Sequence, residues 1–290
     1  MPIRKSEGIK LPSLSAADFE RLSGFVHAQT GIKVTDAKKS LFESRLQKRL
    51  RHLEMDDFGE YCRFLFSGAG IETELHHLID EVTTHKTDFF REPGHFDFLN
   101  DVALPELLKD SGKEGLVIWS AACSTGEEPY TIAMILSENQ ERFFLARGNS
   151  QNFSVLATDI SAGAVQHAKN AIYREEQIAP IPGHLRKKYL LRSKNRARRL
   201  VRMAPEIRSM VRFSPFNLID GDFGQIGRSD IIFCRNVIIY FDRDTQKKLL
   251  QRIYHKLAPG GYLFMGHSEA IHGFGLPLAK VGPSVYRKTA

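Results

Sequence analysis

Two neighbouring glutamates, Glu127 and Glu128, are the first residues in this sequence whose types and spacing suggest chemistry. They stand in WSAACSTGEEPY (119–130), a pattern typical of a buried strand that turns into a helix. A helix amino terminus favours an anion, and such turns usually bind a phosphate. Two carboxylates here would repel a pyrophosphate, which argues against NAD, FAD and ATP. The alternative is that both glutamates only complement the helix dipole.

A third acid, Asp159, ends the apolar run FSVLATD (153–159). At the carboxyl end of a strand, such an acid accepts hydrogen bonds from ribose hydroxyls. The glycine-rich G-x-G-x-x-G pattern is absent, and Gly126 stands alone among small residues. S-adenosylmethionine has ribose hydroxyls, an ammonium and a sulfonium group but no phosphate, so it fits these acids and the later LAPGGYLF.

Other chemistries find little support. His267, Ser268 and Glu269 are triad residue types, but sequence neighbours say little about triad geometry, and STG does not match the G-x-S-x-G elbow of hydrolases. The three cysteines are far apart without C-x-x-C spacing, which argues against a zinc site and a disulfide frame and for a reducing compartment. We therefore expect no metal.

The elements that position these residues follow from hydrophobic patterning. Continuous apolar runs predict strands that are buried on both faces, with helices between several of them. This alternation predicts an α/β fold with a parallel, doubly wound sheet. The predicted strands lie near 115–122, 153–159, 209–218, 229–241 and 260–266, and the predicted helices near 129–139, 162–171 and 244–257.

The first third of the chain shows helical periodicity instead. Four short helices, ending near 30, 53, 66 and 82, predict a small bundle over residues 1–82, and the α/β domain would span 83–290. From Ile181 to Arg212 the chain has eleven Lys or Arg and one acid. We predict that about 178–212 form an inserted β-subdomain.

Composition limits the partners. The chain has 290 residues, a formal net charge of +7 and a pI near 9.3, so an acidic partner is expected. The start MPIRKSEGIKLPS has no apolar core for a signal peptide, and no apolar run approaches the roughly 18 residues that span a bilayer. We expect a cytoplasmic protein without membrane insertion.

Five blocks resemble one known family, the chemotaxis receptor glutamate methyltransferases (CheR): TTHKTDFFRE, WSAACSTGEEPYTIAM, ATDIS, CRNVIIYFD and LAPGGYLFMGHSE. The resemblance covers nearly the whole chain. It implies a helical N-terminal domain, a Rossmann-like class I methyltransferase domain with the inserted β-subdomain, and O-methylation of chemoreceptor glutamates, with S-adenosylhomocysteine as by-product. The implied cofactor contacts are His85, Thr87, Arg91, Ala122, Glu128, Asp159, Asn217, Leu218, Asn236 and Val237.

Two residues are candidates for the catalytic step. Arg91 is expected to pair with a carboxylate, either that of the cofactor or that of the substrate glutamate. Tyr240 is expected to wall the pocket and align the methyl group. A glutamate substrate is already ionised at pH 7, because its pKa is about 4.3, so no general base is nominated.

The resemblance also implies the partner, the cytoplasmic helices of chemoreceptors. The second helix, about 36–53, would carry Leu41 on its apolar stripe and Arg45, Lys48 and Arg49 on a basic face that steers an acidic receptor. The arginine-rich loop RSKNRARRL leaves open whether the β-subdomain binds a receptor C-terminal peptide. We expect a monomer.

Two rival functions remain. A nucleic-acid methyltransferase would suit the positive charge, but the Asn-Pro-Pro-Tyr typical of amino-methylating enzymes is replaced by NVIIY, and aromatic residues are scarce in the basic block. We therefore expect no nucleic-acid partner. A non-catalytic S-adenosylmethionine-binding regulatory protein would bind the cofactor without turnover.

Overall fold

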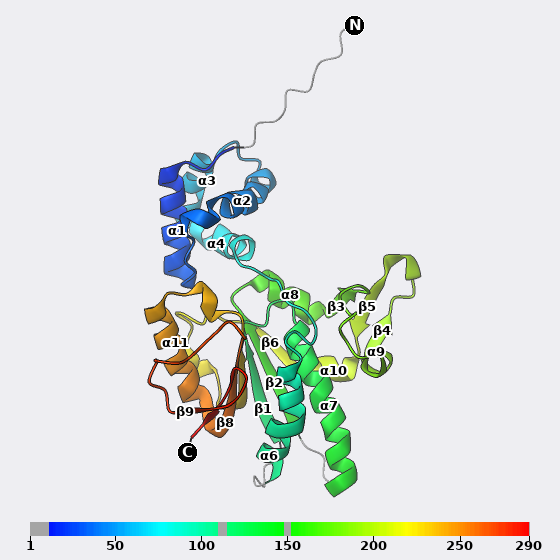
Figure 1. Cartoon of the computed structure of the whole chain (residues 1–290). Coiled ribbons are helices and arrows are strands. Elements are labelled where there is room, and N and C mark those ends of the chain that lie inside the picture. Colours follow the sequence, from blue (N-terminus) through cyan, green and yellow to red (C-terminus); the bar gives the residue numbers. More distant parts are fainter. Residues whose placement is uncertain (1–11, 110–114, 148–151, 290) are drawn as a thin grey trace. The chain divides into compact units, whose positions relative to one another are not determined.

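The computed structural model describes residues 12–109, 115–147 and 152–289, with the side chains of 141–147 left aside. The segment 1–11, on which the expectation about a signal peptide rests, lies outside the described residues. The chain divides into two compact units, 1–83 and 84–290 (Figure 1). Among the described residues, no helix combines the length and the apolar character that crossing a bilayer requires.

The first unit is helical, as predicted. Ser15 caps the first helix by accepting a hydrogen bond from the Asp18 amide, and Gly31 ends it in the left-handed conformation at φ 72°. Apolar side chains of all four α-helices form one buried core. Its elements are α1 (Ala16–Thr30), the 3₁₀ turn η1 (Asp36–Lys38), α2 (Lys39–Leu53), α3 (Phe58–Leu65) and α4 (Gly68–Val82).

The buried face of α2 differs from the prediction. Leu41 was expected inward but is 54% exposed, whereas Arg49, expected on the basic face, is 8% exposed. Arg49 donates from Nε and Nη2 to the two oxygens of buried Glu74 at 2.9 and 2.7 Å. The inward stripe therefore runs through Phe42, Leu46, Arg49 and Leu50. The predicted position of Arg49 on an exposed basic face is therefore wrong, because its guanidinium pairs with Glu74 inside the bundle, and its role in receptor steering stays a prediction.

The second unit contains a seven-stranded sheet in the order β6-β2-β1-β7-β8-β10-β9. The first five of these strands are parallel, and β10 pairs antiparallel with both β8 and β9. In Figure 1, α7 (green) and α11 (orange) lie on either side of the strands, as expected for a doubly wound sheet. The strands are β1 (Gly115–Ala121), β2 (Asn152–Asp159), β6 (Val211–Pro215), β7 (Ser229–Cys234), β8 (Leu257–Met265), β9 (Leu278–Gly282) and β10 (Val285–Lys288).

Two helices of this unit fall close to the predicted ranges, but α7 continues to Arg147, eight residues past the predicted end near 139, and the segment before β1 was not predicted as helix. That segment forms α5 (Gly94–Phe98), a π-helical turn η2 (Leu99–Ala103) and α6 (Leu104–Lys109). Its apolar side chains Phe96, Leu99 and Leu104 enter the main core. The others are α7 (Glu127–Arg147), α8 (Ala162–Asn170), α11 (Arg243–Lys256) and the 3₁₀ turns η4 (Phe223–Gln225) and η5 (Ile238–Tyr240).

The insertion forms a separate antiparallel sheet in the order β3-β5-β4, which projects from the rest of the unit in Figure 1. It begins at Ile172, before the predicted start at 178, and the predicted end at 212 falls inside β6 of the main sheet. Its elements are β3 (Ile172–Arg174), α9 (Gly183–Tyr189), β4 (Leu190–Arg192), η3 (Arg196–Arg198), β5 (Leu200–Met203) and α10 (Pro205–Ser209).

Candidate active site

Most of the predicted cofactor residues follow directly on neighbouring strands. Asn217 comes after β6, Asp159 ends β2, Ala122 follows β1 and Asn236 follows β7. These four strands are parallel and adjacent in the sheet, so their carboxyl ends meet at one edge. Ligands of doubly wound folds bind at this edge. The fold thus brings together residues that are more than a hundred positions apart in the sequence.

The turn after β1 is compact and tied to β2. Ala122 and Ser124 adopt left-handed backbone conformations (φ 64° and 49°). The Ser124 amide donates to Asp159 Oδ2 at 2.8 Å. The Ser161 amide donates to Asp159 Oδ1 at 2.9 Å. Asp159 therefore fixes this turn through both oxygens, and the part it would play toward ribose hydroxyls stays a prediction.

Gly126 closes the same turn at φ 99°. A Cβ there would lie 2.9 Å from Ala168 Cβ and 2.9 Å from the Tyr173 hydroxyl oxygen. The Tyr173 hydroxyl donates to the Thr125 carbonyl at 2.8 Å. The lone glycine thus lets the turn pack directly against α8 and β3, where an L-residue would be both strained and crowded.

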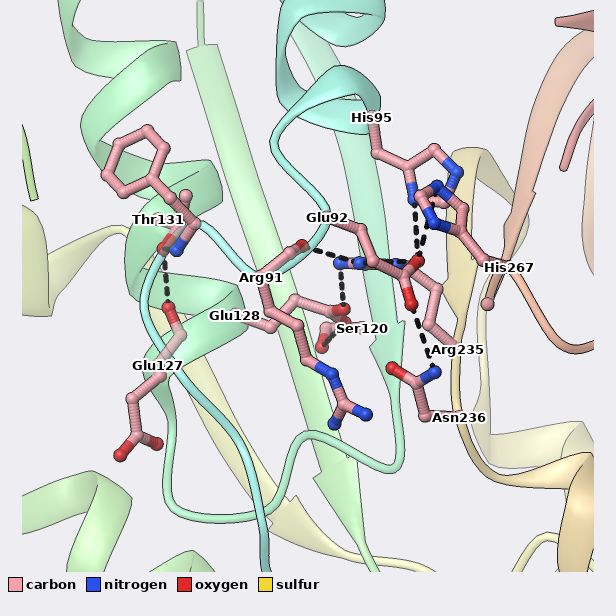
Figure 2. A network of polar contacts seen from close by, with 12 residues as sticks. Arg91, Glu92, His95, Ser120, Glu127, Glu128, Thr131, Arg235, Asn236 and His267 are labelled. Carbon is pink, nitrogen blue, oxygen red and sulfur yellow. Dashed lines mark hydrogen bonds and ion pairs between the residues drawn. The ribbon is translucent and has the colours of Figure 1, made fainter. Parts of the chain in front are cut away.

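Glu128 has a protein partner instead of a free carboxylate. Its Oε1 accepts a hydrogen bond from Ser120 Oγ at 2.7 Å, and its Oε2 accepts one from Arg235 Nη1 at 3.0 Å. Arg235 Nη2 also lies 3.0 Å from Glu92 Oε2 and 2.6 Å from the Arg91 carbonyl. Figure 2 shows the guanidinium held between the two glutamates. The side chain of Arg235 is only 2% exposed, so the pairs are well shielded from water.

This Glu92–Arg235–Glu128 network was missed at the sequence level. Burial is the largest single influence and acts to raise the pKa of Glu92, but the hydrogen bond and charge of Arg235, together with hydrogen bonds from the Asn236 side chain and the His267 backbone, outweigh it and the pKa is lowered. Glu92 stays ionised as a result. The available signal was the charge of Arg235 at the end of an apolar strand, where a buried cation requires acidic partners.

Glu127, which also lies at the start of α7, has a different environment from Glu128. Its carboxylate accepts from Thr125 Oγ1 at 2.7 Å, and the residue is 2% exposed. Burial raises the pKa of Glu127 to about 7. The two glutamates of the opening motif are therefore not two equal acids facing a ligand, because one pairs with Arg235 and the other is buried beside Thr125.

The segment before α5 carries the remaining predicted contacts. The His85 carbonyl accepts from Ser124 Oγ at 3.2 Å, which joins this segment to the turn after β1. Thr87 is half-buried. Arg91 Nη1 donates to the Lys86 carbonyl at 2.9 Å, and in Figure 2 the Arg91 side chain extends away from the Arg235 network.

Beyond β6 and β7, the other predicted residues lie in turns. Asn217 Oδ1 accepts from the Ile219 amide at 3.0 Å, and Leu218 is 6% exposed. The Asn236 side chain donates to Glu92 Oε1 at 3.2 Å. Val237 leads into η5, and half-buried Tyr240 ends that turn with its amide bonded to the Val237 carbonyl at 3.2 Å. Tyr240 thus belongs to the same edge of the sheet as Asn236.

Three residues of this region have the ligand atoms of a metal site. Glu92, His95 and His267 place one such atom each within 4.8 Å of one another. However, Glu92 Oε2, which lies 3.4 Å from His95 Nδ1, already holds Arg235 at 3.0 Å. A divalent cation there would stand beside a buried guanidinium, so the charge arrangement does not favour a metal. Burial lowers the pKa of His95 to about 4.

The residues predicted to bind the receptor belong to the helical unit. Arg45 Nη1 donates to the carbonyls of Val82 and Thr83 at the end of α4 (2.6 and 3.1 Å). Lys48 is 62% exposed and lies 3.8 Å from Glu81. Arg45 is thus partly committed to the fold, while the Lys48 ammonium stands largely in solvent.

Comparison with known proteins identifies close matches over both units. The family model "CheR methyltransferase, SAM binding domain" matches residues 85–284, and "CheR methyltransferase, all-alpha domain" matches 17–83. A chemotaxis protein methyltransferase of Borreliella burgdorferi is 39% identical over 281 residues, which is 95% of each chain. One of Escherichia coli is 39% identical over 257 residues, 89% of this chain and 85% of that one.

A solved structure, magnesium protoporphyrin IX methyltransferase (ChlM) from Synechocystis PCC 6803 with bound SAM, superposes with a TM-score of 0.37 at 14% identity. It covers 78% of this chain and 92% of that one. A likeness this weak adds nothing to what the family models and the curated relatives show.

Proposed function

Because the chain belongs to the CheR methyltransferase family, we propose that it transfers the methyl group of S-adenosylmethionine to glutamate side chains of chemoreceptors and forms methyl esters. The observation that carries the proposal is the match of both family domains across residues 17–83 and 85–284. Relatives named chemotaxis protein methyltransferases align over about nine-tenths of the chain. The enzyme would act in the cytoplasm as a monomer.

The residues at the sheet edge fit this cofactor better than a nucleotide phosphate. Asp159 brings negative charge to the carboxyl end of β2, and the Glu92–Arg235–Glu128 network has two carboxylates for one guanidinium, so an ammonium or sulfonium is favoured and a phosphate is repelled. The residues proposed to hold the cofactor are those at this edge and in the segment before α5: His85, Thr87, Arg91, Ala122, Glu128, Asp159, Asn217, Leu218, Asn236 and Val237.

When bound, S-adenosylmethionine supplies an electrophilic methyl group on a positively charged sulfur. The chain needs no proton acceptor for the attack, because a glutamate carboxylate is already ionised at pH 7. Its task is to position the two reactants and to exclude water, since an anion and a cation lose charge as the bond forms. Tyr240 would wall the pocket, and Arg91 would pair with a carboxylate.

Arg235 supports the proposed role of Arg91 indirectly, through the Arg91 backbone. It donates to the Arg91 carbonyl as well as to both glutamates, so it fixes the backbone that carries the Arg91 side chain. We therefore treat Arg235 as the residue that holds Arg91 in place. Because Arg235 pairs with both Glu92 and Glu128, one cation lies between two anions in the site.

The receptor is proposed to meet two basic surfaces. Lys48 on α2 would attract the acidic receptor helices by long-range electrostatics. In the β-subdomain, a pocket lined by Glu175, Arg192, Ser193, Arg196, Arg199 and Leu200 would take carboxylates of a receptor C-terminal peptide. Titration of receptor C-terminal peptides against the protein tests the second surface, and no binding at millimolar peptide would refute it.

The main experiment incubates the protein with radiolabelled S-adenosylmethionine and receptor-containing membranes and then adds alkali. A glutamate methyl ester releases volatile labelled methanol, which is the expected result. Label that stays on protein after alkali would indicate N-methylation, and label on nucleic acid would support the rival methyltransferase. Cofactor binding without any labelled product would support a non-catalytic regulator.

A further inference from the structure

A buried carboxylate, that of Glu269, holds the turn that follows β7. Its Oε2 accepts hydrogen bonds from the amides of Asn236 and Gly266, each at 2.7 Å. Its Oε1 accepts from the amides of Val237 at 2.8 Å and Ile238 at 2.9 Å. The residue is 4% exposed, so four amide donors converge on one carboxylate away from water.

The backbone of this turn has the shape of an anion-binding nest. Asn236 is left-handed at φ 58° and Val237 follows at φ −124°, so three successive amides point to the same side. Concavities of this kind bind phosphates in many proteins. Here the chain fills the concavity with its own carboxylate, which makes the position unfit for a phosphate ligand.

Glu269 lies in the turn after β8, and this turn places its carboxylate beneath the turn after β7. The Glu269 amide bonds to the Gly266 carbonyl at 2.9 Å, which folds the chain back on itself directly after the strand. A Cβ on Gly266 would lie 2.9 Å from the backbone nitrogen of Asn236, in addition to 2.5 Å from Asn236 Nδ2 and 2.7 Å from Glu269 Oε2. Glycine is therefore required for the two strand ends to approach, and the spacing Gly-x-x-Glu is explained by this contact.

We propose that Glu269 is a positioning residue for methyl transfer, because it fixes the turn that presents Asn236, Val237 and Tyr240. The proposal rests on the proposed function, since the contacts of Asn236 and Val237 with the cofactor and the alignment of its methyl group by Tyr240 belong to it. Glu269 acts through the backbone and touches neither reactant. Without its carboxylate, three amides of a turn with a left-handed Asn236 lose their acceptors, and the turn relaxes.

Glutamine is the informative replacement, because it keeps the shape of the side chain. It retains one acceptor oxygen but turns an NH₂ group toward two amide donors, so two hydrogen bonds are lost and like dipoles face each other. We expect Glu269→Gln to weaken S-adenosylhomocysteine binding at least tenfold and to raise KM for S-adenosylmethionine, with KM for the receptor unchanged. Glu269→Asp keeps the charge but is one methylene shorter, and an intermediate loss is expected.

Glu74→Gln is the matched control. Glu74 is as deeply buried (2% exposed) and also accepts several hydrogen bonds, but it belongs to the helical unit. Calorimetric titration with S-adenosylhomocysteine should give this variant the parental Kd within twofold, despite a lower melting temperature. A folded Glu269→Gln protein with the parental Kd would overturn the proposal, and so would an equal loss of affinity in Glu74→Gln.

If Glu269→Gln does not fold, hydrogen exchange in the parent and in Glu269→Asp tests the positioning role instead. In the ligand-free parent, the amides of 236–238 should be protected, and in Glu269→Asp they should exchange at least tenfold faster. Exchange at the rate of an exposed loop in the parent would refute the positioning role. A parent protein that exchanges slowly at 236–238 but binds no S-adenosylhomocysteine would instead refute the proposed function.

Discussion

Replacing Arg235 by methionine is the sharpest test of how the site is held together. Methionine keeps the apolar length of the side chain but leaves Glu92 and Glu128 without the guanidinium that lies 3.0 Å from each. Their side chains are each 14% exposed, so water replaces the lost cation only in part. Removing one partner of a buried ion pair costs about 3–5 kcal/mol. We expect a loss of that size in the stability of the α/β unit at pH 8.

The loss of stability in Arg235→Met should depend on pH. In Arg235→Met the two carboxyl groups lack a cation, so their pKa values rise in the folded protein above the unfolded value of about 4.3. A carboxyl group with a raised folded pKa favours the folded state below the unfolded pKa and loses that contribution as the pH rises through the folded pKa. The deficit relative to the parent should therefore shrink from pH 8 toward pH 5.5.

The assay uses the intrinsic fluorescence of the chain. Trp119 is the single tryptophan, fully buried in β1, so urea unfolding followed at this residue reports on the α/β unit. Arg287→Met is the control, because Arg287 forms a half-exposed pair with Glu106 at 2.9 Å and should change stability by about 1 kcal/mol or less. An Arg235→Met loss below about 1 kcal/mol, or one equal at both pH values, would refute this reasoning.

Three further predictions follow from single contacts. Arg49→Met should destabilise the helical unit by about 3–5 kcal/mol, because buried Glu74 loses its bidentate partner; protection of α2 amides from hydrogen exchange measures this, and unchanged protection would contradict it. Glu127→Gln should gain stability relative to the parent as the pH rises from about 4 to about 7, by about 3–4 kcal/mol at most, and the difference should level off above that pH. The reason is that burial raises the pKa of Glu127 to about 7, so the parent loses the contribution of its protonated carboxyl between the unfolded pKa of about 4.3 and the folded pKa; urea unfolding with no pH trend in the difference would be inconsistent with this. Gly126→Ala should cost about 1–3 kcal/mol and weaken S-adenosylhomocysteine binding several-fold, because its φ is 99° and its Cβ would lie 2.9 Å from the Tyr173 hydroxyl oxygen; parental affinity and stability would show that the turn tolerates the change.

The sequence by itself determined the elements and the family. Apolar periodicity located the four helices of the first unit and the five parallel strands of the second, because burial on one helix face or on both sheet faces leaves a local pattern. It missed α5, η2 and α6, whose apolar residues were not assigned a helix, and it missed the short strands β9 and β10. Ala122 and Asp159 were placed at strand ends correctly, since the end of an apolar run is visible in the residues alone. The apolar run 229–241 continues past Asn236, so the end of β7 at Cys234 was not visible in the pattern.

The pairing of charges was decided only by the tertiary structure. The sequence presented Arg49 and Glu128 as accessible charges, yet the fold gives them buried partners 25 and 107 positions away. It presented Glu269 only as one of three neighbouring triad residue types with no assigned role, yet the fold places it beneath the turn after β7. A periodic pattern indicates which face of an element is buried, but not which charge or amide from a distant part of the chain packs against that face. That depends on how strands and helices far apart in the sequence come to lie side by side.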